Sequence, residues 1–139
     1  LYAASLLLLF THFRFGNVSA AFVKLRNGQL DEAENLLDQI KRPEWLAKRH
    51  RAYYHFSKGL IATQHQDLPE GETHLKAALD LGLRSATDNA MAALNLAHLY
   101  FVGQQKTIAQ TYLSQAKTFQ SDDLLIREKI AELEKVLSL

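Results

Sequence analysis

The chain has 139 residues, of which 47% are hydrophobic, and its net charge is +1. This length suits one domain, the apolar content excludes a disordered chain, and the near-zero charge excludes a general attraction to nucleic acid. Cysteine is absent, which excludes disulfides and thiol chemistry, and the chain has only two prolines, which favours long helices.

The chain opens on an apolar stretch, residues 1–13, which ends before Arg14. A helix needs roughly 20 apolar residues to span a bilayer, so this stretch is too short to do so alone. Two interpretations of residues 1–14 stay open: the end of a transmembrane segment, or an apolar leading helix that packs on the rest of the fold. Such a helix, if exposed, would favour self-association. A signal peptide is disfavoured, because residues 15–27 are needed for the first helical hairpin.

Apolar residues then recur at helical spacing, which predicts helices and no strands. Asp67, Ser85 and Asp123 are typical helix-capping residues, and Gly82 is typical of a helix end. With their caps included, we expect helices over residues 15–26, 30–41, 43–63, 67–82, 85–102, 107–119 and 121–139.

Small residues recur at a constant interval along the chain. Ala33, Gly71 and Ala109 are spaced by 38 residues (71 − 33 = 38 and 109 − 71 = 38). A leucine follows each of them four residues later, and a small residue precedes each by twelve. A repeat of this length is typical of stacked helical units. The predicted units are residues 15–42, 43–84 and 85–120, followed by a polar-faced capping helix over 121–139.

Three segments carry a family resemblance: LRNGQLDEAENLLDQI at 25–40, KGLIATQHQDLPEGETHLKAAL at 58–79 and LAHLYFVGQQKTIAQTYLSQAK at 96–117. They resemble tetratricopeptide repeats. The resemblance implies an all-α fold, a right-handed α-solenoid of about three helical hairpins with a C-terminal capping helix. The 38-residue period exceeds the usual length of about 34. The tryptophan expected early in the first helix of a repeat is absent. Trp45 lies in the added turn instead, where we expect it to pack between repeats.

The resemblance also implies a function, protein–protein interaction as an adaptor or assembly module. In this family the first helix of each hairpin lines a concave face, and another protein or a peptide helix binds there. Matching positions give a mostly apolar face made of Phe22, Leu25, Tyr53, Phe56, Leu60, Met91, Leu94, Asn95, His98 and Phe101. An apolar face of this kind suits a partner helix, although the same side chains are also typical of plain core between helices.

A basic segment with interleaved aromatic residues supports an alternative function. Residues 41–58 hold six lysines and arginines against Glu44 alone, together with Tyr53, Tyr54 and Phe56. Such a surface is typical of binding to anionic lipid or to RNA. A third interpretation pairs the basic side chains with the neighbouring acidic helix and buries the aromatic residues.

The sequence gives little support for metal binding or for enzymatic activity. The six histidines show no i, i+4 pair of the kind that holds a metal on one helix, and phosphate-binding glycine loops and nucleophile motifs are absent. We therefore expect no enzymatic activity, no cofactor and no metal. The sequence does not indicate the compartment; a membrane-associated or a cytoplasmic location fits it best.

Overall fold

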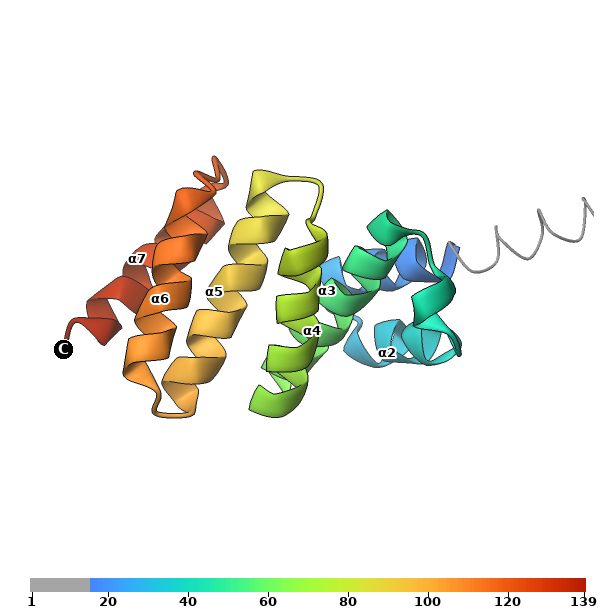
Figure 1. The fold of residues 1–139 in the computed structure, drawn as a ribbon, viewed down its shortest axis with the longest axis horizontal. Coiled ribbons are helices and arrows are strands. Elements are labelled where there is room, and N and C mark those ends of the chain that lie inside the picture. Colours follow the sequence, from blue (N-terminus) through green and yellow to red (C-terminus); the bar gives the residue numbers. More distant parts are fainter. Residues whose placement is uncertain (1–15) are drawn as a thin grey trace, which may run out of the picture.

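The computed structural model describes residues 16–139, so the predicted leading segment, residues 1–14, lies outside the described residues, as does Phe15. Residues 16–139 contain helices and no strands, which confirms the all-α class (Figure 1). Residues 16–26 are helical. The elements that follow are α2 (Leu30–Asp38), the 3-10 helix η1 (Pro43–Trp45), α3 (Lys48–Gln64), α4 (Leu68–Leu81), α5 (Ala86–Val102), α6 (Lys106–Thr118) and α7 (Leu124–Leu137).

The predicted caps open three of these helices. The Asp67 side chain accepts a hydrogen bond from the backbone N–H of Glu70 at the start of α4, and Ser85 does the same for Asp88 at the start of α5. The Asp123 side chain accepts from the N–H of Ile126 and opens α7. Each bond satisfies a backbone donor that the first turn of a helix leaves unpaired.

One predicted helix is wrong in its extent. We expected a continuous helix over 43–63, but the chain forms η1 and then breaks before α3 begins at Lys48. The break lies at Leu46, whose backbone is extended with ψ 146° and whose side chain is buried. Burial of this leucine in the core outweighs the helical continuity that the sequence pattern favoured.

Three turns share one hydrogen-bond pattern. Gly28, Gln66 and Gln104 each follow a helix end with a positive φ, of 76°, 54° and 62°. In each turn this residue donates its N–H to the carbonyl three residues earlier, and the next residue donates to the carbonyl five residues earlier. This pattern satisfies carbonyls at the end of a helix. The two glutamines adopt a conformation that costs a non-glycine residue energy, which the two hydrogen bonds offset.

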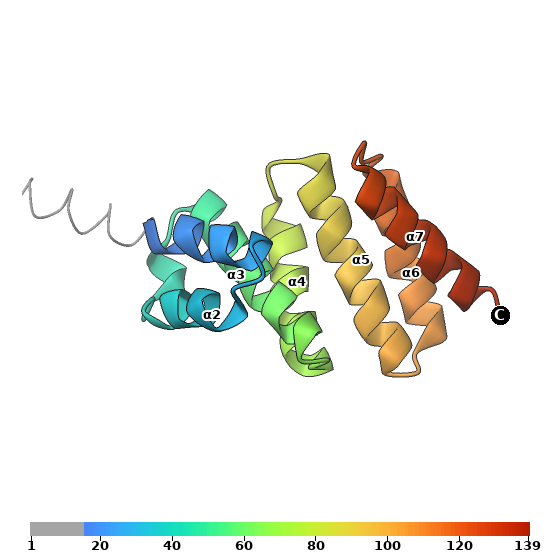
Figure 2. The same cartoon turned by 180° about the vertical axis from the view of Figure 1, so that it is seen from behind.

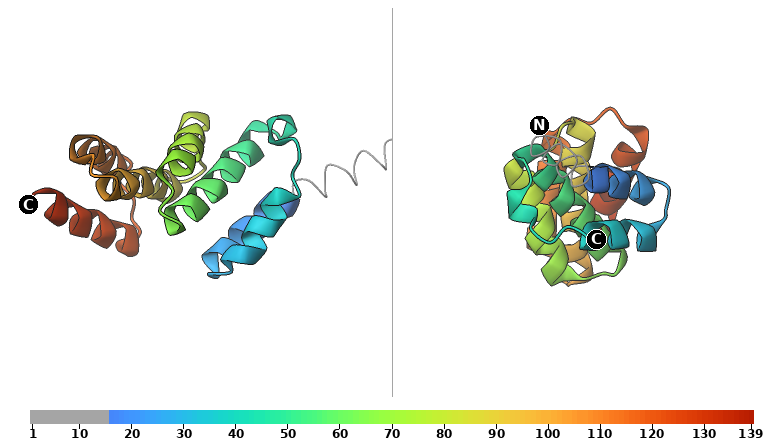
Figure 3. Two further views of the ribbon diagram at one scale, coloured as in Figure 1. Left: turned by 90° about the horizontal axis from the view of Figure 1, so that it is seen from below. Right: turned by 90° about the vertical axis from the view of Figure 1, so that its right-hand side faces the viewer.

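The helices form an arc. Seen from below in Figure 3, α4 and α6 lie on one side of the arc, while residues 16–38 and α7 form its two ends. Helix α5 contacts both α3 and α7, whereas no Cα atom of α4 lies within 8 Å of α2 or α6. The helix of residues 16–26 and α7 come forward in the opposite view (Figure 2). We call the side on which helix 16–26, α3, α5 and α7 meet the inner face.

Two hydrophobic clusters hold the arc together. The larger cluster runs from Ala52 in α3 to Leu137 in α7, and the smaller one joins Val18, Leu37 and Leu46 near the beginning of the described chain. The small and leucine positions that recur every 38 residues are all buried. They are Ala21, Gly59 and Ala97; Ala33, Gly71 and Ala109; and Leu37, Leu75 and Leu113.

Candidate protein-binding face

Helix α5 supplies the centre of the inner face. It contacts α3, α4, α6 and α7. Most of the alanine and leucine side chains of α5 are therefore buried. A stripe remains partly exposed at Met91, Asn95 and His98, and it ends at Phe101, whose side chain is 37% exposed. Residues at these spacings lie on one side of a helix. The predicted residues of α5 therefore share one accessible stripe, with the exception of Leu94.

Leu94 and Phe56 are buried in the larger cluster. The fold covers both side chains, so they lie beneath the surface that the other predicted residues share, and their expected contact with a partner stays a prediction. They support the inner face from beneath. Leu25 packs against the smaller cluster and is partly buried there.

Aromatic rings extend the face across α3. Phe22 lies edge-on to Tyr53, with ring centroids 5.5 Å apart, and its centroid lies 5.8 Å from that of Phe56. Leu60 is also partly exposed and packs against the larger cluster. Phe22, Tyr53 and Leu60 therefore pack against the same larger cluster as Met91 of the α5 stripe.

Tyr53 has a structural task as well. Its hydroxyl donates to Asp88 Oδ2 at 2.6 Å and accepts the backbone N–H of Arg84 at 3.1 Å, which links α3 to the start of α5. Burial and the hydrogen bond to Asp88 raise the pKa of Tyr53 to about 12. The Tyr53 hydroxyl is therefore already paired within the fold.

Asn95 has one side-chain hydrogen bond within its own helix. Its Nδ2 donates to the carbonyl of Met91 on its own helix at 2.8 Å. Its Oδ1 takes part in none of the hydrogen bonds among residues 16–139, so the inner face presents an acceptor in the middle of an apolar stripe.

Sequence reasoning missed a histidine pair. His55 on α3 and His74 on α4 place their Nδ1 atoms 2.9 Å apart with stacked rings, and His74 Nε2 lies 3.3 Å from a Glu70 carboxylate oxygen. With neutral rings, Glu70 accepts the Nε2 proton of His74, so His55 donates from Nδ1. Nineteen residues separate the two histidines in sequence, and no local spacing signals their contact.

A second missed group lies on the outer side of the arc. The rings of Tyr100 on α5 and Tyr112 on α6 stack with centroids 5.6 Å apart, and Lys76 Nζ of α4 lies 5.7 Å and 5.9 Å from their centroids. Lys76 also pairs with Glu72 at 2.8 Å, and this hydrogen bond raises the pKa of Lys76. These contacts are cation–π and ion-pair links between helices. They tie α4 to α6 where the two backbones lie apart.

An open pocket of about 420 Å³ lies between α6 and α7. None of the predicted site residues lines it. Polar and charged side chains predominate in its lining. Two of the lining residues, Lys117 and Glu134, form an ion pair. This pocket is separate from the inner face.

The basic segment differs from the prediction in two ways. Trp45 is 63% exposed instead of packing between repeats, and the guanidinium carbon of Arg42 lies 5.1 Å from the centroid of its ring. The acidic residues of α2 pair with Lys24 and Lys58, so Lys48, Arg49 and Arg51 take part in none of the ion pairs of the described chain. Their expected pairing with that helix is therefore wrong.

Within residues 16–139, no three histidine, aspartate or glutamate side chains converge as a metal site would require. In the same part of the chain, no helix combines the length and the apolar character that crossing a bilayer requires. Comparisons of this sequence and structure with protein-family models, curated proteins and solved structures return no match.

Proposed function

We propose that this chain is a right-handed α-solenoid of tetratricopeptide-like hairpins that binds a partner protein along its inner face. Regular helix starts support the repeat. Helices α3, α5 and α7 begin at Lys48, Ala86 and Leu124, which are 38 residues apart (86 − 48 = 38 and 124 − 86 = 38). Helices α2, α4 and α6 begin at the same interval, and so do the three turns with a positive φ.

The curvature follows from unequal contacts on the two sides of the arc. Each first helix of a hairpin touches the next first helix, while the second helices α2, α4 and α6 stay apart. Stacked helical pairs of this kind produce a concave surface on the side where the helices lie closer. The first helices therefore line the face that we assign to the partner. In this view α7 continues their row and closes the end of the solenoid.

The observation that carries the binding proposal is the accessible stripe of α5. Met91, His98 and Phe101 stay partly exposed, whereas the residues from Ala90 to Tyr100 other than Met91, Asn95 and His98 are buried. A surface that is apolar and incompletely covered suits the apolar side of an amphipathic helix. Asn95 Oδ1 provides one hydrogen-bond acceptor within it. We therefore propose a helical segment of another protein as the partner.

We propose a binding module and not an enzyme. The polar groups that converge in the described chain include the histidine pair, the Tyr53–Asp88 contact and the Lys76 cluster. Each of them joins two or more helices, and none lines an enclosed cavity of the kind that excludes water from a reaction. No cofactor enters this proposal.

A peptide-display selection with helix-forming sequences tests the proposal. We expect selected amphipathic helices to lose at least about tenfold in affinity on Phe101→Glu, which corresponds to about 1.4 kcal/mol. A carboxylate at this position would have to be desolvated without a charged partner. The helical content, measured by circular dichroism, is expected to stay the same, because Phe101 is already partly exposed.

The matched control is Ile108→Glu on α6. Ile108 is 39% exposed, slightly more than Phe101 at 37%, but it lies on the second helix of its hairpin. We expect this variant to bind the selected peptides as the parent chain does. A folded Phe101→Glu variant with unchanged affinity, or equal losses for both variants, would contradict the inner face as the binding site.

A further inference from the structure

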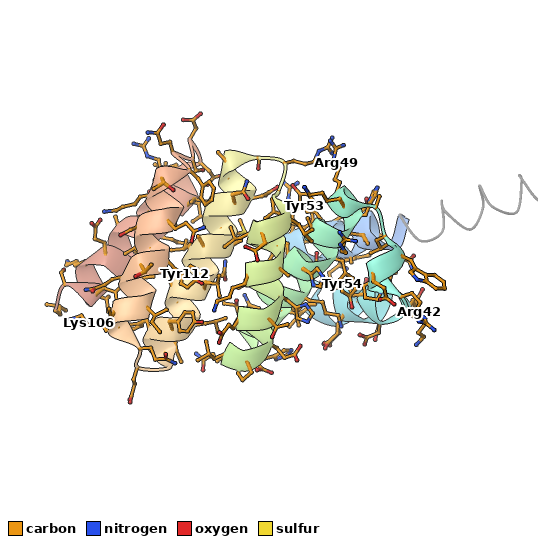
Figure 4. The ribbon with its side chains drawn as sticks, in the orientation of Figure 1. Arg42, Arg49, Tyr53, Tyr54, Lys106 and Tyr112 are labelled. Atoms are coloured by element: carbon orange, nitrogen blue, oxygen red, sulfur yellow. The ribbon has the colours of Figure 1, made fainter. Side chains whose placement is uncertain are left out.

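The end of the molecule around η1 exposes a tryptophan among cations. Trp45 is 63% exposed and carries Arg42 against its ring. Lys41, Lys48 and Arg49 are exposed as well. Figure 4 shows Arg42 at this end of the arc, Arg49 in the same half of the molecule at its upper edge, and Lys106 at the opposite end. A large aromatic ring of this kind is usually buried or placed at an interface.

Charge is concentrated at this end. Residues 41–51 contain five lysines and arginines and one acid, Glu44, for a local charge of +4 (5 − 1 = +4). Since the whole chain carries +1, the remainder carries −3 (1 − 4 = −3). Glu44 lies 3.7 Å from Arg42, and both side chains are exposed. The other basic residues of the segment are outside the ion pairs of the described chain. The surface is therefore complementary to a dense negative charge.

The apolar beginning of the chain joins the fold at the same end. Asn17 Nδ2 donates to Gln39 Oε1 at 3.1 Å, and Val18 shares the smaller cluster with Leu46, the neighbour of Trp45. Residues 1–13, which lie outside the described residues, precede this point and are apolar in composition. Thus an apolar segment, an exposed tryptophan and a group of cations all belong to one end of the molecule.

We propose that this end rests on an anionic phospholipid bilayer, and we call the surface formed by Lys41, Arg42, Trp45, Lys48 and Arg49 the basic tip. Tryptophan rings favour the headgroup region of a bilayer, because they are apolar with one polar N–H. Lysine and arginine are attracted to the negative surface of the headgroups, and the attraction falls off within a Debye length. The inner face stays free for its partner when the tip is docked.

The structure favours a bilayer over RNA as the occupant. Single-stranded nucleic acid binds through bases that stack on exposed aromatic rings. The aromatic residues interleaved with the cations cannot provide such a platform: Tyr54 and Phe56 are buried, and Tyr53 packs against Phe22 with its hydroxyl paired to Asp88. Only Trp45 is exposed among the aromatic residues of the segment, and the adjoining apolar stretch matches lipid, not RNA.

Trp45 is the only tryptophan of the chain, so its fluorescence reports on the tip directly. The experiment titrates the full chain with vesicles of phosphatidylcholine, with and without phosphatidylserine, and repeats the titration with vesicles that carry a brominated lipid. We expect a blue shift of the emission and quenching by the brominated lipid, with tighter binding to the vesicles that contain phosphatidylserine. Binding is expected to weaken at about 1 M salt, where the Debye length is about 3 Å.

The double variant Arg42→Glu with Arg49→Glu is expected to bind these anionic vesicles at least about tenfold more weakly. Lys106→Glu, which reverses an exposed charge at the opposite end, is the control and is expected to bind as the parent chain does. Phe101→Glu is also expected to leave vesicle binding unchanged, which separates this proposal from the inner-face proposal.

Three results would overturn the proposal. Equal binding to neutral and anionic vesicles, unaffected by the double variant, would assign any lipid contact to residues 1–13 alone. An emission that stays unchanged while the chain binds vesicles would show that the tip remains in water. A Trp45 response to single-stranded RNA in the absence of any response to vesicles would assign the basic tip to nucleic acid.

Discussion

His55 and His74 place two titratable rings in contact across α3 and α4. Burial, followed by the charges of His74 and Arg51, lowers the pKa of His55 from 6.5 to about 4. Burial also lowers the pKa of His74, although Glu70 acts in the opposite direction and Lys58 lowers it further. One proton shared between the two Nδ1 atoms is compatible with the contact, whereas a proton on both of them is not.

The pair therefore predicts a loss of stability in mild acid. Because the folded-state pKa of His55 lies below the ordinary value of 6.5, the unfolded chain binds more protons between pH 6.5 and pH 4. The stabilisation is complete above pH 6.5 and is lost as the pH falls toward 4. We expect the urea midpoint to fall between pH 7 and pH 5. His55→Phe should flatten this dependence, whereas the exposed His65→Gln should leave it unchanged; equal slopes in all three proteins would contradict the prediction.

Two buried serines differ in their hydrogen bonds. Ser57 is 0% exposed and its hydroxyl has no hydrogen-bond partner, while the hydroxyl of the buried Ser121 bonds to that of Thr87 and accepts the N–H of Asp123. An unsatisfied buried hydroxyl costs roughly 1–3 kcal/mol, and a satisfied one contributes about 1 kcal/mol.

We expect Ser57→Ala to raise the free energy of unfolding by about 1 kcal/mol and Ser121→Ala to lower it by about as much. Urea denaturation of the two variants beside the parent chain measures both changes. A loss of stability in Ser57→Ala similar to that in Ser121→Ala would mean that the Ser57 hydroxyl contributes to the fold.

At the scale of the elements, the small residues of the repeat set how closely helices approach. A Cβ atom on Gly59 of α3 would lie 2.4 Å from both Cγ and Cδ2 of Leu75 on α4. A Cβ atom on Gly71 would lie 2.1 Å from Leu99 Cδ1, but its next neighbour is 3.6 Å away. Rotation of one terminal methyl relieves the second clash, whereas the first involves the branch point of the leucine.

Gly59→Ala is therefore expected to destabilise the chain by about 1–3 kcal/mol, even though alanine favours a helix by about 1 kcal/mol over glycine. Gly71→Ala should lower the stability of the chain by less than Gly59→Ala does, and it is therefore the matched comparison. Thermal or urea denaturation checks the order. If Gly59→Ala proved as stable as the parent chain, α3 and α4 would have room to separate and the close approach would not be needed.

Among the elements, the helix caps were predicted correctly from the sequence. The capping residues Asp67, Ser85 and Asp123 act as expected, because a cap depends on backbone groups within three residues. The break before α3 was not predicted. It depends on the burial of Leu46 in the smaller cluster, which includes Val18, 28 residues earlier in the sequence (46 − 18 = 28).

At the scale of the whole molecule, stability is unevenly distributed. Helix α5 contacts four other helices and lies within the larger cluster, while α2 contacts α3 and the helix of residues 16–26 and belongs to the smaller cluster. Local opening is expected to be easiest where contacts are fewest.

Native-state hydrogen exchange should therefore show slower exchange in α5 than in α2. Peptide-resolved mass spectrometry measures the difference, and α3 and α4 serve as internal comparisons because they contact each other extensively. Equal protection from residue 16 to residue 139 would indicate a single cooperative unit and would contradict the uneven distribution.

The sequence by itself determined the helices other than the broken one at 43–63, three of their caps and the buried small positions, because helical periodicity and capping are local properties of the chain. Only the tertiary structure decided which residues of the predicted face are exposed. Phe56 and Phe101 both match the expected face, yet neighbouring helices bury the former and leave the latter exposed. The pairing of His55 with His74 and the exposure of Trp45 were likewise decided by packing between distant segments. Spacing along one helix carries no information about how closely the next helix approaches it.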